Sequence, residues 1–95
     1  NVRMNLPTLD EFKQKSLAAG FDEVLERDWA PNTVLDTHTH PFSVQAVVTR
    51  GEMWLTMQGQ TLHLLPGSTF ALDREVPHDE RYGAEGATYW VARKN

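Results

Sequence analysis

The chain of 95 residues contains no cysteine, which excludes disulfides, thiolate metal sites and a cysteine nucleophile. It also lacks any run of basic residues, and its formal net charge is −4. This charge argues against nucleic acid or an anionic membrane surface as a partner. No apolar stretch is long enough to span a bilayer or to direct secretion. We therefore expect a cytoplasmic protein that binds a small molecule or another protein.

The N-terminal part of the chain has the pattern of a short helix. Thr8 and Glu11 have the spacing of a capping box, in which each side chain bonds the backbone of the other residue. Gly20 suits the left-handed position that often follows a helix. We therefore predict a helix over residues 8–19 and assign residues 1–21 to an N-terminal arm and this helix.

The rest of the chain, residues 22–95, has the pattern of a single β domain with a small core. Short β-type runs are separated by turns rich in glycine and proline, and we expect two of these turns at Arg50-Gly51 and at 83–86. Short strands at regular spacing predict a sandwich or a barrel. The predicted strands are 23–29, 33–40, 44–50, 52–58, 60–65, 69–72, 77–82 and 87–93.

Two histidines separated by one residue form the first candidate metal site. Alternate side chains of a β-strand point to the same face, so His38 and His40 can bind one metal ion together. Pro41 then interrupts the strand, and Gln45 in the next run can return to the same cavity whatever its parity. A third histidine, His78, lies far along the chain, and only the fold can bring it close.

The residues around these histidines form two patterns. The first is His-x-His, then Gln, then Gly, at His38, His40, Gln45 and Gly51. The second is Gly, then Pro-Gly-x-x-Phe, then Val-Pro-His, at Gly59, Pro66, Gly67, Phe70, Val76, Pro77 and His78. Each pattern alone is weak, because His-x-His arises by chance and Pro-Gly marks any turn. Together they resemble the motifs of the small single-domain cupins, over a segment from about Trp29 to Arg93.

The resemblance to cupins implies a fold, a cofactor and an assembly. The implied fold is all-β, a jelly-roll β-barrel or sandwich, here preceded by a short N-terminal helix. The implied cofactor is one divalent transition metal per chain, held by His38, His40, Gln45 and His78. The implied assembly is a homodimer, in which the strand near residues 22–29 could pair across the subunit boundary.

The ligand set leaves the identity of the metal open. Imidazole binds Fe, Mn, Ni, Cu and Zn alike, and a carboxamide oxygen is a weaker, neutral ligand than a carboxylate. The commoner cupin has Glu where this chain has Gln45. A shell of three imidazoles and one amide keeps the full charge of the ion, so it favours an anionic ligand at the open positions. Alternatively, Gln45 lies outside the shell as a hydrogen-bond donor.

Two residues that follow His78 have the chemistry of proton transfer. Glu80 and Tyr82 share the face of His78 if the strand is regular, which would place a carboxylate and a phenol beside the ion. An apolar cavity raises the pKa of a carboxyl group toward neutrality, as general acid–base catalysis requires, whereas a nearby cation lowers it. The alternative for Glu80 is a salt bridge with Arg74 or Arg81 at the barrel mouth.

The remaining candidates support the site or line its pocket. Asp36 shares the parity of His38 and His40, so its carboxylate either orients an imidazole or lies at the rim. His63 has no motif around it, and we expect it on a solvated strand face. The residues expected to line the pocket are Met53, Trp54, Phe70, Tyr89 and Trp90.

Three functional classes fit this sequence. We expect an enzyme that acts on a small anionic molecule with a carboxylate or enolate group, through Lewis-acid or oxygen chemistry, as the dioxygenases, isomerases and lyases among the small cupins do. One cupin subgroup that opens the rings of unsaturated uronates also uses Gln. That subgroup carries an acidic residue on its final strand, whereas the corresponding segment of this chain, Thr88–Ala92, contains none. This difference argues against sugar chemistry. The alternatives are a ligand sensor and a metal-stabilised structural domain.

Overall fold

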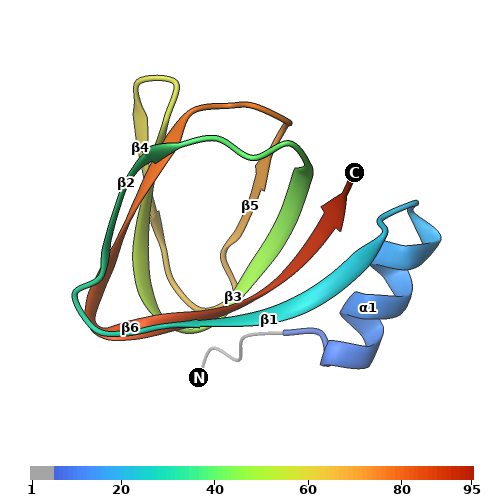
Figure 1. The fold of residues 1–95 in the computed structure, drawn as a ribbon. Coiled ribbons are helices and arrows are strands. Elements are labelled where there is room, and N and C mark those ends of the chain that lie inside the picture. The colour runs from blue at the N-terminus through green and yellow to red at the C-terminus, as the bar shows by residue number, and fades with distance from the viewer. Residues whose placement is uncertain (1–5) are drawn as a thin grey trace.

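One helix and six strands follow one another in the computed structural model, which describes residues 6–95. Residues 1–5 of the expected arm lie outside this range. The strands enclose a core, and the helix lies against the outside of the β domain (Figure 1). The elements are α1 (Leu9–Ala18), β1 (Glu23–Trp29), β2 (Val34–His38), β3 (Ser43–Met57), β4 (Gln60–Leu64), β5 (Thr69–Leu72) and β6 (His78–Lys94).

The predicted capping box begins the helix. The Thr8 hydroxyl accepts a hydrogen bond from the Glu11 backbone N–H, and the Glu11 carboxylate accepts one from the Thr8 N–H. Gly20 has a φ of +96° just beyond the last turn, as the helix-end signal predicts. The helix packs against β1 and β6, where Phe12 lies 6.2 Å from the ring of Trp90.

Two long strands, β3 and β6, are shared by both layers of the fold. They pair antiparallel with each other along most of their length. The first half of β3 also pairs with β5 and its second half with β4. The end of β6 pairs with β1 and its beginning with β2. The result is two four-stranded layers joined through β3 and β6, which is a jelly-roll arrangement (Figure 1).

The strand breaks predicted at Arg50-Gly51 and at residues 83–86 are wrong, because both segments lie inside continuous strands. The register between β3 and β6 shifts between Val48 and Arg50 and again after Gly51. Such bulges bend a strand without ending it. Gly51 has a φ of +81°, and a methyl group at this position would overlap the backbone of Gly86. The two glycine-containing segments therefore cross at the bend where the strands pass from one layer to the other.

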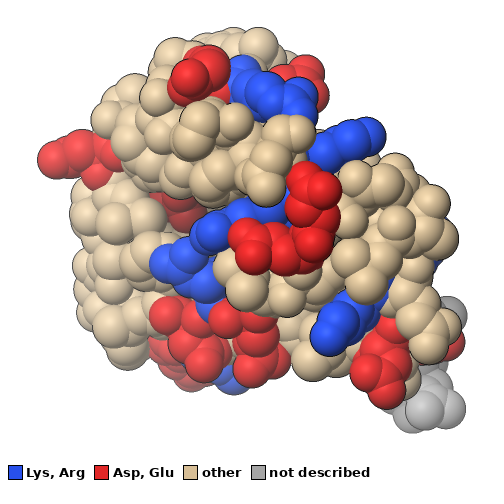
Figure 2. Space-filling model, turned by 45° about the vertical axis from the view of Figure 1, so that its right-hand side comes forward, with Lys and Arg blue, Asp and Glu red and all other residues tan. Residues whose placement is uncertain are grey.

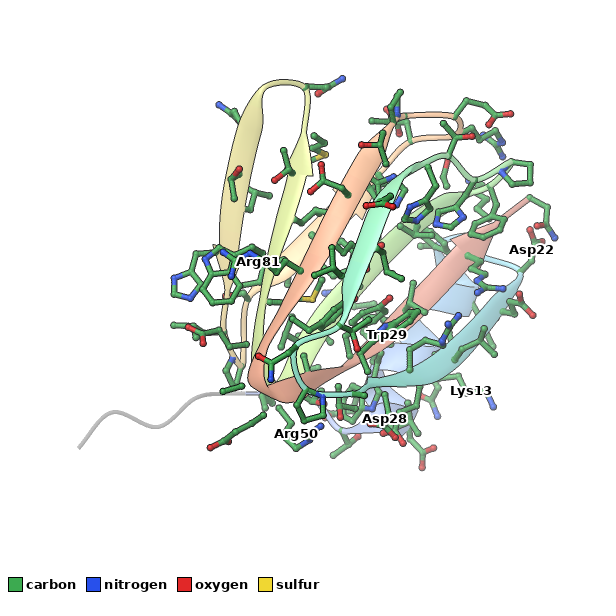
Figure 3. All side chains as sticks on the ribbon, turned by 60° about the vertical axis from the view of Figure 1, so that its left-hand side comes forward. Lys13, Asp22, Asp28, Trp29, Arg50 and Arg81 are labelled. Carbon is green, nitrogen blue, oxygen red and sulfur yellow. The ribbon has the colours of Figure 1, made fainter. Side chains whose placement is uncertain are left out.

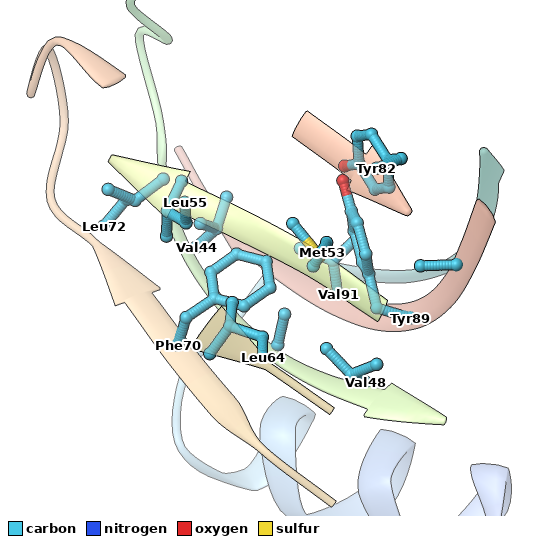
Figure 4. Close-up of a cluster of buried hydrophobic side chains, with 12 residues drawn as sticks. Val44, Val48, Met53, Leu55, Leu64, Phe70, Leu72, Tyr82, Tyr89 and Val91 are labelled. Carbon is cyan, nitrogen blue, oxygen red and sulfur yellow. The ribbon is translucent and has the colours of Figure 1, made fainter. Parts of the chain in front are cut away.

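The core consists of the inward side chains of both layers. On β3, Val48 precedes the bulges and Met53 follows them, and both point inward although their spacing is odd. The bulges therefore change the parity of β3 once. Figure 4 shows this core, in which the phenol oxygens of Tyr82 and Tyr89 face each other. The largest fully buried side chains are Tyr82, Met53, Leu55 and Val48.

The surface carries charges of both signs. On the face shown in Figure 2, basic side chains form a band that is flanked by acidic ones. Within residues 6–95, none of the helical structure is long and apolar enough to cross a membrane. The strand β1 pairs with β6 along its whole length, and the pairing of β1 with a second copy of the chain stays a prediction.

Candidate metal centre

Three histidines from separate segments converge at one end of the barrel. His38 ends β2, His40 lies in the loop that follows, and His78 begins β6. His38 and His78 are register partners, so the pairing of β2 with β6 brings them together. One ring nitrogen from each histidine lies within 4.8 Å of the other two. This spacing allows all three imidazoles to reach one metal ion after a small adjustment.

Backbone carbonyl groups orient two of the three rings. Nδ1 of His38 lies 2.7 Å from the carbonyl oxygen of Asp36, and Nδ1 of His78 lies 2.9 Å from that of Val76. Because a carbonyl only accepts, each Nδ1 donates the proton of this bond, and in the neutral tautomer that results Nε2 presents a lone pair. Asp36 contacts the His38 imidazole through its backbone carbonyl, whereas its carboxylate, which the sequence offered either as an orienting group or as a rim residue, belongs to an exposed side chain.

The buried Nε2 atom of His78 indicates whether the three histidines are suited to bind a metal. His78 is 2% exposed, and its Nε2 has no hydrogen-bond partner among the described residues. A buried polar atom without a partner is costly unless something binds it. The free lone pair faces the other two histidines, so the donor set fits a divalent transition metal.

His40 is held in the form that binds metals. Its ring stacks on Phe42, with 4.9 Å between centroids and 12° between planes. Burial lowers the pKa of His40 below its ordinary value, and four nearby groups lower it further, namely His78, His38, Arg93 and Arg27. The ring is therefore neutral at physiological pH, as metal ligation requires.

A buried carboxylate lies beside two of the histidines. Oε2 of Glu80 is 3.5 Å from Nε2 of His38 and 3.6 Å from Nε2 of His78, and the Glu80 side chain is 8% exposed. The other oxygen, Oε1, accepts a hydrogen bond from the Tyr82 hydroxyl. Burial, with Tyr89 and Glu80 nearby, raises the pKa of Tyr82, so this phenol keeps its proton. Tyr82 holds one carboxylate oxygen while the other faces the histidines.

The histidine cluster opens into a cavity of about 110 Å³. The His38 side chain is 32% exposed, so the cluster can be reached from one side. Of the residues predicted to line the pocket, Phe70 and Tyr89 do so. Two arginines, Arg27 on β1 and Arg93 on β6, line the same cavity and were not identified from the sequence.

Gln45 does not reach the histidines, contrary to the sequence-based expectation. It is exposed and lines a groove between β3 and α1 on the outer side of the barrel. The pairing of β3 with β5 is regular from Val44 to Val47. Since Val44 and Ala46 point into the core, the residue between them points outward. Pro41 changes the direction of the chain but does not bring Gln45 inside.

Trp54 also lies outside the pocket for which it was predicted. Its inward neighbours on β3 are buried in the core, so its own side chain faces out. The ring stacks on His63 at 4.8 Å, and the Arg81 guanidinium lies over it at 4.1 Å. Figure 3 labels Arg81. Nε2 of His63 lies 2.6 Å from the Glu52 carboxylate, on the exposed face where the sequence placed this histidine.

Two further pocket residues are located differently from the prediction. Met53 is fully buried in the core and does not line the cavity. Trp90 lies on the outer side beneath α1, where its Nε1 donates to the Glu26 carboxylate. Arg74 binds backbone carbonyls at the C-terminus. The sequence analysis offered a salt bridge of Glu80 with Arg74 or Arg81 as the alternative to proton transfer. Neither arginine forms this salt bridge.

The sequence and its fold have recognisable relatives. Residues 20–92 match the family model of the AraC-like ligand binding domain. Among curated protein sequences, none matches significantly. The fold resembles DddQ, a DMSP lyase from Ruegeria pomeroyi, with a TM-score of 0.69 and 19% identity. It also resembles an RmlC-like cupin from Shewanella frigidimarina, with a TM-score of 0.66 and 18% identity, and an oxalate oxidase in complex with the substrate analogue glycolate, with a TM-score of 0.66 and 22% identity.

These structural matches establish the cupin fold, and their low identities establish no shared activity. Each match covers 76% of this chain. The chain spans 37% of DddQ, 65% of the RmlC-like cupin and 41% of the oxalate oxidase. The jelly-roll fold predicted from the two histidine motifs is thereby confirmed.

Proposed function

The chain belongs to the AraC-like ligand-binding domain family, which is of the cupin type, and we propose that it is a metal-dependent enzyme acting on a small anionic molecule. The buried, unpartnered Nε2 of His78, which faces two other histidines in an accessible cavity, is the observation that carries this proposal.

In this proposal, three histidines and one carboxylate hold the metal. His38, His40 and His78 supply imidazole nitrogens, and Oε2 of Glu80 supplies the fourth donor. The Glu80 carboxylate is buried with one hydrogen bond and no Lys or Arg partner among the described residues, so a metal would supply the missing positive charge. In this proposal Glu80 occupies the ligand position that the sequence analysis gave to Gln45. Glu80 is then a metal ligand and not the proton-transfer group that the sequence analysis expected.

The residues around the site would set its geometry. A bound metal would act as a Lewis acid toward an oxygen of the ligand. Tyr82 fixes the Glu80 carboxylate by holding its second oxygen, and the aromatic rings of Phe42 and Phe70 form part of the apolar lining of the cavity. Imidazole and carboxylate ligands fit Fe, Mn, Ni, Cu and Zn, so the identity of the metal is left to measurement.

The accessible side of the cluster favours catalysis over a purely structural metal. Structural sites are closed by protein ligands, whereas catalytic sites keep a position open to solvent or substrate. The partly exposed His38 lies at the open side of this centre. A second function, ligand sensing without turnover, is favoured by the match to a ligand-binding family.

A turnover assay distinguishes an enzyme from a sensor. The protein is loaded separately with Fe²⁺, Mn²⁺ and Zn²⁺, incubated with glycolate, pyruvate, oxalate and malonate, and followed by ¹³C NMR. We expect metal-dependent conversion of at least one compound, which the His78→Ala variant would lose. Ligands that raise the melting temperature without conversion under any metal would contradict the enzyme proposal and support a sensor.

A further inference from the structure

The guanidinium group of Arg93 has a buried N–H without a partner. Its Nε is buried and makes no hydrogen bond to any described residue. At its other end, Nη1 lies 3.4 Å from the Glu23 carboxylate, and the group lies 4.7 Å from the ring of Phe42. Buried donors are normally satisfied, so the unpaired Nε–H is a donor that the chain leaves unused, on a side chain that lines the cavity.

A second arginine lies on the neighbouring strand. Arg27 on β1 pairs in register with Tyr89 on β6, and its guanidinium lies 4.9 Å from the ring of Trp29. Within residues 6–95, Arg27 forms no salt bridge. Both arginines line the cavity into which the histidines open.

The charges at the cavity favour an anion. The lining contains two guanidinium groups and one carboxylate, that of Glu80. A divalent metal held by neutral imidazoles would add two positive charges. Guanidinium groups bind carboxylates through parallel N–H bonds, and such charge-assisted bonds are among the strongest in proteins. The same cavity is small, at about 110 Å³, which limits the ligand to a few heavy atoms.

We propose that Arg27 and Arg93 form a carboxylate clamp that selects a short-chain carboxylic acid and directs its second oxygen-bearing group toward the metal. The proposal rests on the proposed function for the metal end of the ligand, whereas the clamp itself depends only on the two arginines. It assigns the carboxylate to the β1–β6 side of the cavity and the reacting group to the histidine side.

Calorimetric titration of the zinc-loaded protein tests the clamp. The probes are glycolate and glycolamide, which have similar shapes but differ in charge. We expect glycolate to bind at least about tenfold more tightly, and Arg93→Gln and Arg27→Gln each to lose most of that preference. Arg81→Gln is the matched control, because it removes an arginine that also lies over an aromatic ring but faces outward. It should preserve the preference.

Further measurements separate the clamp from the metal and from folding. If Arg93→Gln fails to fold, Arg93→Lys takes its place. Lysine keeps the positive charge but lacks the paired N–H donors of a guanidinium, so we expect a reduced preference for glycolate over glycolamide. If zinc does not bind, the proposed function fails, and the metal-free protein should still prefer glycolate. Equal binding of glycolate and glycolamide by the wild type would overturn the clamp even with zinc bound. Tighter binding of inorganic phosphate than of glycolate would overturn the assignment to a carboxylate.

Discussion

His78→Ala should lose nearly all of its bound metal. The substitution removes the most buried imidazole of the cluster and leaves two histidines and one carboxylate. A first-row metal held by three protein donors instead of four should bind at least about 100-fold more weakly. After zinc loading and dialysis, elemental analysis of the untagged wild type should give close to one metal per chain. The variant should give a small fraction of that value.

Three variants serve as controls for this measurement. His63→Ala removes a histidine on the outer face, and Gln45→Ala removes the amide that the sequence placed in the shell, so both should keep the metal. Glu80→Gln keeps the shape of the side chain but removes its charge, so we expect weaker binding than in the wild type. Full occupancy in a folded His78→Ala protein would remove this histidine from the metal site.

Gly51→Ala should destabilise the fold strongly. The residue has a φ of +81°, and its new Cβ would overlap the Gly86 carbonyl oxygen and lie 2.7 Å from Cα of Ala87. Both neighbours are backbone atoms of the paired strand and cannot move independently. Strain and overpacking together should cost about 3 kcal/mol or more. For a domain of this size, thermal unfolding should show a melting temperature lower by about 12 °C or more.

Gly59→Ala is the matched control for the crowding at Gly51. Gly59 has a similar φ of +78°, but an added methyl group there would have no neighbour within 4 Å. Only the cost of the left-handed conformation remains, which is about 1 kcal/mol. Equal losses of stability in the two variants would show that the close approach of β3 to Gly86 does not matter for the fold.

Local patterns predicted much of the fold. The capping box at Thr8 and the left-handed Gly20 located the helix, and both depend only on neighbouring residues. The alternation of β-type runs located β1 and β5 at their observed bounds. The breaks predicted near Gly51 and Gly86 failed because a glycine in a turn and a glycine in a bulge look alike in sequence.

The candidate site was predictable where a motif described it. His38, His40 and His78 were identified from spacing and resemblance, and the structure brings their rings together. Gln45 was misplaced because the parity of a strand after a proline cannot be read from the residues before it. Trp54 was wrongly predicted to face the pocket because the bulges near Gly51, just before it, change which residues of β3 point inward.

The two arginines of the cavity were missed because no local pattern marks them. Arg27 lies on β1 and Arg93 near the end of β6, four register positions apart, and only the pairing of these strands brings both to the lining of one cavity. One signal was available in the sequence. Arg93 has the same parity as Tyr89 and Val91, so a final strand with an inward tyrosine should also have an inward arginine.

The pH dependence of metal binding follows from the state of the imidazoles. The depressed pKa of His40 means that the native state prefers the neutral ring. Stability from this preference is present above the unfolded pKa of about 6.5 and is lost as the pH falls through the lower native value. A metal also needs neutral imidazoles, so protons compete with it at several ligands at once. The metal-bound protein should therefore lose stability in acid more steeply than the metal-free protein.

A paired melting series tests most directly whether these histidines hold a metal. Melting temperatures are measured from about pH 8 down to about pH 5, once with zinc and once with a chelator. Because a metal that binds the folded state stabilises it by mass action, zinc should raise the melting temperature at the upper end of the range. We predict that the gap between the two series closes below about pH 6. Two series that stay parallel over the whole range would contradict the metal centre.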